Sequence, residues 1–275
     1  MQLIKALLFW GMGLGSVKPL SAVAQNELNR GISHNDYLQH RPLQDALEAG
    51  YTNLEADIFL HHGRLVVAHW FPYLKGAGTL DKLYLEPLSR YVKEHCNEEG
   101  FSPITLLIDI KSSPLKTYLA LRKQLQQYSD VLSVYEGKRV NQGLINIVLT
   151  GRQPVQFIQQ ESSRWVLMDD ALNAPPNAAM PDGFVMASCR YSQVLKWRGR
   201  GAMPDAEQHK LISLVNSAHS QGKKARLWAS PENDQVRREL LACGVDYLNT
   251  DRLAELKAFF SARHAAQTAI TINQP

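Results

Sequence analysis

The chain has 275 residues, of which 45% are hydrophobic, and carries 30 Lys and Arg residues against 26 Asp and Glu residues. The formal net charge of +4 is too mild to favour nucleic-acid binding. The three cysteines, Cys96, Cys189 and Cys243, are widely separated, so neither a cysteine metal site nor a full disulfide framework is predicted, and at most one bridge can form. This length suits either two ordinary domains or one α/β barrel.

The first residues have the order of a secretory signal peptide. A basic start precedes the apolar run Ala6–Leu14, and a polar stretch ends in Ala22-Val23-Ala24, with small residues where a cut after Ala24 requires them. A membrane-spanning helix needs roughly 20 apolar residues, and Lys18 interrupts this run too early. We therefore expect an exported protein, periplasmic or secreted, whose mature chain covers residues 25–275 and has no stable membrane anchor.

Short runs of β-branched and aliphatic residues alternate with amphipathic stretches through most of the chain. Strands are predicted, in chain order, at 31–34, 53–60, 65–69, 104–110, 145–150, 165–168, 183–188, 225–229 and 247–250. Helices are predicted at 42–49, 115–125, 209–221 and 234–242, and three of them run into a Gly at 50, 222 or 244.

The third of these strands is predicted to be the return arm of a hairpin, because a turn-rich tetrapeptide at 61–64 separates it from the second. Without that arm eight strands remain, which favours a single-domain TIM-type (β/α)₈ barrel of the α/β class over an open sheet. No composition break divides the chain, and the Pro-rich segment 174–181 is interpreted as a loop between a strand and a helix. Catalytic residues of such barrels lie at the C-terminal ends of the strands.

Polar residues gather where the first strands end. The second strand carries Glu55 and Asp57 two residues apart, and the fourth run carries Asp109 and Lys111 with the same spacing. Alternate strand residues project to one face, so the members of each pair point together. Three converging carboxylates repel one another unless a cation lies among them, and a hard divalent ion with oxygen ligands, Mg²⁺ or Ca²⁺, answers this need.

Each group taken alone also has an ordinary explanation. A lone strand carboxylate is usually just exposed, an isolated His is more often a hydrogen-bonded structural residue, and Asp109 with Lys111 suits a simple salt bridge. The functional interpretation rests on the coincidence of these groups with His34, at the end of the first strand, and His69, at the end of the hairpin arm.

Four spaced blocks resemble those of the phosphatidylinositol-phospholipase-C-like phosphodiesterases, a superfamily that includes glycerophosphodiester phosphodiesterases and the sphingomyelinase D toxins. The blocks are His34-Asn35-Asp36, Leu54-Glu55-Ala56-Asp57, Val66-Val67-Ala68-His69 and Leu107-Ile108-Asp109-Ile110-Lys111. The Ser-His-Asn-Asp-Tyr opening is similar to the branch that contains the altered-inheritance-of-mitochondria protein. The resemblance extends over about residues 31–260 and includes a closing strand, 244–252, similar to that of glycerophosphodiesterases.

The resemblance implies a metal-dependent phosphodiesterase that uses one divalent cation and acts on a glycerophosphodiester or a (lyso)phospholipid. The cleavage would proceed either directly or through a cyclic phosphate. It implies these roles: His34 and His69 as the acid/base pair, Glu55, Asp57 and Asp109 as metal ligands, Asn35 and Lys111 as phosphate-binding residues, and Trp228 as a wall of the substrate pocket. A small-molecule or lipid substrate, no nucleic-acid partner and a monomeric state are expected.

Two departures from the family pattern leave the substrate open. Asn35 stands where typical glycerophosphodiesterases have Arg, and Asp109 stands where they have Glu, whereas Asp109, Lys111 and Trp228 look more like the sphingomyelinase D arrangement. One alternative is a catalytically silent barrel that binds a phosphoester. Another is a glycoside hydrolase, which would use the paired carboxylates but leave both histidines without a role.

Overall fold

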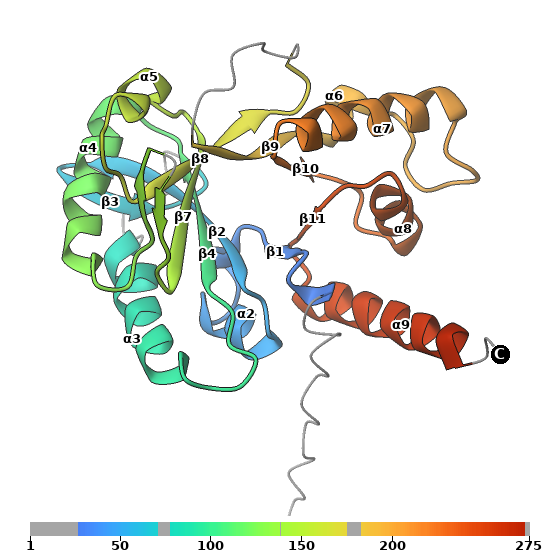
Figure 1. Ribbon diagram of the computed structural model, residues 1–275, viewed down its shortest axis with the longest axis horizontal. Helices are drawn as coiled ribbons and strands as arrows, with labels where there is room; N and C mark the ends of the chain where they lie inside the picture. Colours follow the sequence, from blue (N-terminus) through green and yellow to red (C-terminus); the bar gives the residue numbers. More distant parts are fainter. Residues whose placement is uncertain (1–26, 71–77, 138, 175–182, 273–275) are drawn as a thin grey trace, which may run out of the picture.

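The computed structural model describes residues 27–70, 78–137, 139–174 and 183–272. The predicted signal peptide at 1–24 and the segment 175–181 of the predicted Pro-rich loop lie outside these residues. Figure 1 shows the strands surrounded by helices, with α9 projecting at the C-terminal end. Among the described residues, no helix combines the length and the apolar character needed to cross a bilayer. All three cysteines are free.

Eight parallel strands close into a barrel, and a ninth strand pairs with one of them from outside the closed ring. The barrel consists of β1 (Gly31–Ser33), β2 (Asn53–His61), β4 (Ile104–Ile110), β7 (Ile145–Gly151), β8 (Val166–Ala171), β9 (Phe184–Arg190), β10 (Lys224–Trp228) and β11 (Tyr247–Thr250). The extra strand, β3 (Arg64–Val67), runs antiparallel to β2. The predicted (β/α)₈ barrel and its hairpin arm are confirmed.

Helices follow most of the barrel strands. They are α2 (Gln44–Ala49), α3 (Glu86–His95), α4 (Pro114–Leu125), α5 (Val155–Gln159), α6 (Tyr191–Val194), α7 (Asp205–Ser220), α8 (Asp234–Ala242) and α9 (Leu253–Ile272). Short 3₁₀ turns lie at Asp36–Leu38 and Gln126–Tyr128, and a π-helical turn at Asp81–Leu85 leads into α3. A second, small hairpin consists of β5 (Val134–Glu136) and β6 (Arg139–Asn141).

The strand pattern divides each barrel strand between an outer and an inner face. On β2, Leu54, Ala56 and Ile58 belong to the large core that the helices cover, so Glu55 and Asp57 face the barrel interior. Inside the barrel, a smaller apolar cluster consists of Ile32, Leu107, Val148 and Met186. The inner residues that come next along these strands are polar.

The barrel closes between β1 and β2, and the pairing there is slight. Three residue pairs join β1 to β11, but only one pair, Ser33 with Leu54, joins β1 to β2. The side-chain amide of Asn53 reinforces this junction by donating to the carbonyls of Gly31 (3.2 Å) and Asn29 (2.8 Å).

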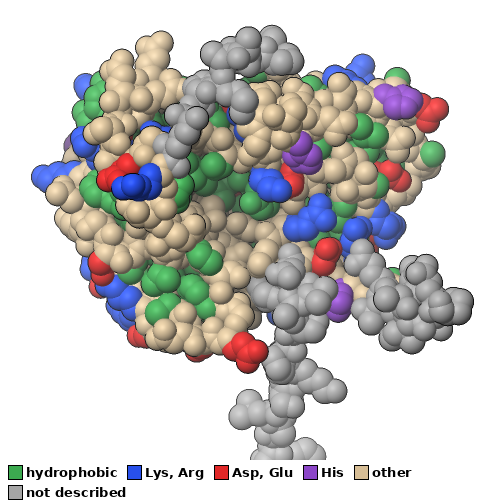
Figure 2. Space-filling view, viewed as in Figure 1, with side chains coloured by type: hydrophobic (Ala, Val, Ile, Leu, Met, Phe, Trp, Pro, Cys, Tyr) green, Lys and Arg blue, Asp and Glu red, His purple; other side chains and the backbone are tan. Residues whose placement is uncertain are grey.

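Charged side chains are spread over the surface in view. Figure 2 shows Lys and Arg side chains on this face in several separate groups among Asp and Glu, not in one continuous basic patch.

Candidate active site

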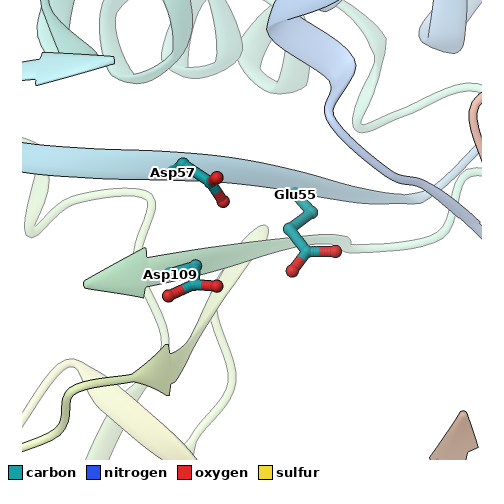
Figure 3. A group of neighbouring side chains, drawn as sticks. All are labelled: Glu55, Asp57 and Asp109. Atoms are coloured by element: carbon teal, nitrogen blue, oxygen red, sulfur yellow. The ribbon is translucent and has the colours of Figure 1, made fainter. Parts of the chain in front are cut away.

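Three carboxylates from neighbouring strands converge inside the barrel. Asp57 on β2 is the register partner of Asp109 on β4, and Glu55 precedes Asp57 by two residues. One carboxylate oxygen from each of the three lies within 4.8 Å of the others (Figure 3). Glu55 and Asp57 are almost fully buried, with 4% and 3% of their surface exposed. The i, i+2 spacing on β2 and the pairing of β2 with β4 therefore bring the three predicted metal ligands together, and such a cluster can bind a metal ion.

Two cations lie among these carboxylates. The Lys111 ammonium is 2.6 Å from Asp109 Oδ2 and 3.3 Å from Asp57 Oδ2. Arg226, which is 2% exposed, forms an ion pair with Glu55 Oε2 and donates from Nε to Asn249 Oδ1 at 2.8 Å. Each carboxylate thus has a cationic partner supplied by the chain.

Burial and charge oppose each other in the pKa values of this cluster. Burial alone would raise the pKa of Glu55, but the charges of Arg226 and His34 outweigh it and hold the pKa below its usual value. Burial raises the pKa of Asp109 despite the neighbouring Lys111. On β8, burial raises the pKa of Asp169 to about 7, against the opposing effect of Arg226. Burial therefore disfavours the charged form of a carboxylate in the barrel interior, and a neighbouring cation opposes this effect.

The β2–β3 hairpin positions His69 beside the carboxylate cluster. Because β3 runs antiparallel to β2, the chain returns toward Asp57, and the Ala68 amide donates to the Asp57 carbonyl at 3.1 Å. His69 Nδ1 then lies 2.9 Å from Asp57 Oδ2. The Tyr37 hydroxyl lies 2.9 Å from the same oxygen and 3.1 Å from His69 Nδ1. Tyr37 was not predicted as a site residue.

His34 follows β1 and has a carboxylate partner of its own. Its Nδ1 lies 2.7 Å from Oδ1 of Asp251, which follows β11, the strand beside β1. Asn35, with a left-handed φ of 47°, places its side-chain amide 3.3 Å from the same oxygen. Burial would lower the pKa of His34, but the hydrogen bond to Asp251 and the charge of Glu55 raise it. The protonated form of His34 is therefore favoured.

One carboxylate oxygen of the cluster is buried without a partner. Asp109 Oδ1 makes no hydrogen bond within the described part of the chain. Gly151, the register partner of Ile110, leaves room for it, because a Cβ at this position would lie 1.9 Å from that oxygen. An orphaned carboxylate oxygen is costly unless it receives a ligand, so the residues present fit a bound cation.

The remaining predicted residue, Trp228, lies at the end of β10, two residues after Arg226. It is 37% exposed, and the Arg190 guanidinium lies 5.7 Å from its ring centre. Arg226 itself was not predicted as a site residue, although its alternation with Trp228 on a predicted strand is the same signal that identified Glu55 and Asp57. Asp251 had the weaker signal of a carboxylate directly after the last strand.

Known proteins resemble this chain along most of its length. The family model of the AIM6-like phosphodiesterase domain matches residues 28–105 and 96–169. The altered inheritance of mitochondria protein 6 of Eremothecium gossypii is 29% identical over 272 residues, covering 84% of this chain and 69% of that protein. The homolog from Arthroderma benhamiae is 23% identical over 271 residues, covering 85% of this chain and 86% of that protein.

A solved structure supports the fold. The glycerophosphodiester phosphodiesterase from Agrobacterium tumefaciens str. C58 matches with a TM-score of 0.50 and 14% identity, covering 85% of this chain and 99% of that one. At this identity the likeness concerns the barrel alone. The family model matches more than half of the chain. The chain belongs to the AIM6-like phosphodiesterase family.

Proposed function

We propose that this protein is a divalent-metal-dependent phosphodiesterase that cleaves a small-molecule or lipid phosphodiester, such as a glycerophosphodiester or a (lyso)phospholipid. The observation that carries the proposal is the placement of two histidines, each held by a carboxylate, beside the cluster of Glu55, Asp57 and Asp109. Membership of a phosphodiesterase-type family supports it.

Glu55, Asp57 and Asp109 would hold the cation, with the orphaned Asp109 Oδ1 as one of its ligands. A bound divalent ion supplies Lewis-acid polarisation of the non-bridging phosphate oxygens, which lowers the barrier to attack on a charged diester. Lys111 and Asn35 would bind the phosphate, and Trp228 would line the pocket for one of the ester groups.

The two histidines would transfer the protons. Each uses Nδ1 for its carboxylate, so Nε2 is the nitrogen available to the substrate. We assign His34 as the acid that protonates the leaving alcohol, because Asp251 favours its protonated form. His69, oriented by Asp57 and Tyr37, would accept the proton of the attacking group. The attacking group is water or a substrate hydroxyl beside the phosphate, which would give a cyclic product first.

The test is turnover of bis(p-nitrophenyl) phosphate and of a panel of glycerophosphodiesters and lysophospholipids. We expect EDTA to abolish product release and an added divalent ion to restore it. His34→Ala and His69→Ala should each lose about 10²-fold or more in kcat while keeping the circular dichroism of the parent protein. The control is His219→Ala on α7, whose Nε2 contacts Asp246 and not the cluster. Undiminished turnover in either catalytic variant would refute the assignment.

A second candidate is a phosphoester-binding barrel without turnover. Lys111 and Arg226 favour it, because their two positive charges already offset most of the charge of the three carboxylates without an ion. This function would show tight binding of phosphodiesters by calorimetry and no product with any metal, so the same panel separates the two candidates.

A further inference from the structure

We propose that one side of the barrel mouth docks reversibly on an anionic lipid bilayer, through exposed apolar side chains and exposed cations that lie there together. The mouth is the end at which the barrel strands finish and at which the candidate active site lies. Such docking goes beyond the proposed phosphodiesterase activity, because it concerns the surface that the protein binds, and it can be measured without turnover.

Leu38 is the most exposed large hydrophobic side chain among the described residues, at 68%. It lies in the 3₁₀ turn after β1, and both of its neighbours in the chain contact the site. The Tyr37 hydroxyl lies 3.1 Å from His69 Nδ1, and the Gln39 side-chain amide donates to the Asp251 carbonyl at 3.0 Å. Leu38 is therefore held at the edge of the mouth without being covered.

Two tryptophans share this edge. Trp70, after β3, is 63% exposed, and its ring centroid lies 4.8 Å from that of His69 in an edge-on contact. Trp228, the last residue of β10, is 37% exposed. The other exposed large hydrophobic residues of the described part, Leu115, Leu119 and Val140, lie on α4 and β6. Single exposed apolar side chains are ordinary on a protein surface, but several of them at the opening of a site indicate an interaction surface.

The three side chains belong to one continuous sector of the barrel. Around the ring, β10 pairs with β11, β11 with β1, and β1 with β2, whose hairpin partner is β3. Figure 1 shows these barrel strands in succession. Trp228 ends β10, Leu38 follows β1 and Trp70 follows β3. They therefore lie along one side of the mouth.

Four exposed cations lie beside this sector, at and after the end of the neighbouring strand β9. They are Arg190, Lys196, Arg198 and Arg200, and none of them forms an ion pair with another described residue. The Arg190 guanidinium lies 5.7 Å from the Trp228 ring centre.

The loop that carries the other three cations is tied to the start of α8, which follows β10. The Gln235 side chain donates to the Gly201 carbonyl at 2.7 Å, and the Asn233 side chain donates to the Arg198 carbonyl at 3.4 Å. Two carboxylates in the first turn of α7, Asp205 and Glu207, offset half of the charge of the four cations. An excess of positive charge therefore remains beside the exposed apolar side chains.

A bilayer with anionic headgroups fits both features. Tryptophan is enriched at the membrane–water interface, and a leucine side chain gains free energy when it leaves water. Anionic headgroups attract exposed Lys and Arg side chains. Because the side chains come from separate loops, a fluid surface can accommodate them without the fixed shape that a folded partner would have to match. Docking through this sector brings the candidate active site against the lipid.

The test is cosedimentation of the recovered protein with vesicles of phosphatidylcholine alone, and with vesicles of phosphatidylcholine and phosphatidylglycerol in equal amounts. We expect the apparent dissociation constant to be lower for the anionic vesicles by about tenfold or more, and the binding to weaken as salt is added. Brominated phosphatidylcholine in the anionic vesicles should quench tryptophan fluorescence, because Trp70 would reach the boundary of the acyl chains.

Leu38→Ser and Trp70→Ser should each weaken binding to the anionic vesicles by about tenfold, since each removes one apolar side chain from the docked surface. Trp70→Ser should also remove much of the quenching. Arg198→Gln should weaken binding by about fivefold through the loss of one cation. Leu38 and Arg198 are open to solvent, so their substitution should leave the fold intact even if Trp70→Ser fails to fold. All variants carry the same N-terminus, so a contribution of residues 1–24 cancels in each comparison.

Val140→Ser and Lys123→Gln are matched controls at the opposite end of the barrel. Val140 is 51% exposed and lies on β6, in the hairpin that precedes β7. Lys123 is exposed in the last turn of α4, and a helix that follows a barrel strand runs back from the mouth. Neither control should change the binding to vesicles.

The outcomes separate docking from the proposed activity. Selective binding to anionic vesicles that Leu38→Ser and Arg198→Gln weaken and both controls leave intact supports docking, whether or not a substrate has been found. Absence of vesicle binding, equal binding to neutral and anionic vesicles, or equal losses in the controls overturns it and leaves the proposed phosphodiesterase standing. Binding to heparin without binding to anionic vesicles would identify a soluble polyanion as the occupant and would also overturn it.

Discussion

Arg226 and Glu55 reach each other across the inside of the barrel, from β10 and β2, and form an ion pair that is closed to solvent. Their positions in the sequence are 171 residues apart. Glu55 belongs to the proposed metal site, and because the pair is buried, its loss should first lower stability.

Arg226→Met should lower the free energy of unfolding by roughly 3 to 5 kcal/mol, because it leaves the buried Glu55 carboxylate without its cation. Urea denaturation of the metal-free protein measures this. The double variant Arg226→Met/Glu55→Leu should recover most of the loss, since no uncompensated charge remains. A single variant as stable as the parent would show that Glu55 is not charged in the folded protein.

Gly151→Ala should weaken metal binding well beyond its effect on stability. The new Cβ would lie 1.9 Å from Asp109 Oδ1, so the carboxylate must leave its position in the cluster. Gly63→Ala is the control, because Gly63 has a φ of +75°, close to the +70° of Gly151, but nothing lies within 4 Å of its added Cβ. Both variants should lose about 1 kcal/mol of stability from the left-handed backbone, and Gly151→Ala should lose more because its Cβ would also lie 2.8 Å from the Ile110 carbonyl oxygen. Calorimetry should find weaker metal binding in Gly151→Ala alone.

Asp251→Asn should shift the pH dependence of turnover. Asp251 raises the pKa of His34, so its removal lowers that pKa, and the protonated acid is lost at a lower pH. The alkaline limb of the kcat/KM profile should therefore move toward lower pH, with a loss of roughly tenfold at neutral pH. Asp246→Asn breaks the comparable contact with His219, away from the cluster, and should leave the limb in place. An unmoved limb in Asp251→Asn would mean that another group is the acid.

Export remains a proposal that one experiment can decide. We expect the protein recovered from an expressing cell to begin at Gln25, because Ala22 and Ala24 satisfy the small-residue pattern before the cut. N-terminal sequencing of the recovered protein reads this directly. Ala24→Arg should block the cut and leave residues 1–24 attached. Recovery of the parent protein with its first residues intact would contradict the proposal.

Much of the barrel could be predicted from local pattern. The runs 104–110, 234–242 and 247–250 have the predicted bounds, because each is a clean periodic segment between turn or cap residues. The helices α3, α5, α6 and α9 and the short β5–β6 hairpin were not predicted. Residues 86–95 do carry a helical pattern, which buries Leu88, Ser89 and Val92 on one face, and the prediction missed it. The elements α5, α6, β5 and β6 have five residues or fewer each and are too short for a periodic signal.

In the candidate site, too, some contacts follow from local sequence pattern and others depend on how distant strands pair. Glu55 with Asp57 and Asp109 with Lys111 could be paired from strand alternation, which is local. The contacts of Arg226 with Glu55 and of Asp251 with His34 depend on which strands meet when the barrel closes, and the members of the second pair are 217 residues apart. A single sequence does not show which strands become neighbours in the barrel, although it contains every residue that takes part in these contacts.

The single residue pair between β1 and β2 has a consequence for motion. His34 follows one of these strands, and Glu55 and Asp57 belong to the other, so the weakest joint of the cylinder runs between the proposed acid and the proposed metal ligands. Few ladder hydrogen bonds resist local opening there. Local opening between β1 and β2 would move the proposed acid away from the proposed metal ligands without unfolding the rest of the barrel. Amide exchange should therefore be faster there than along the seven residue pairs that join β4 to β7.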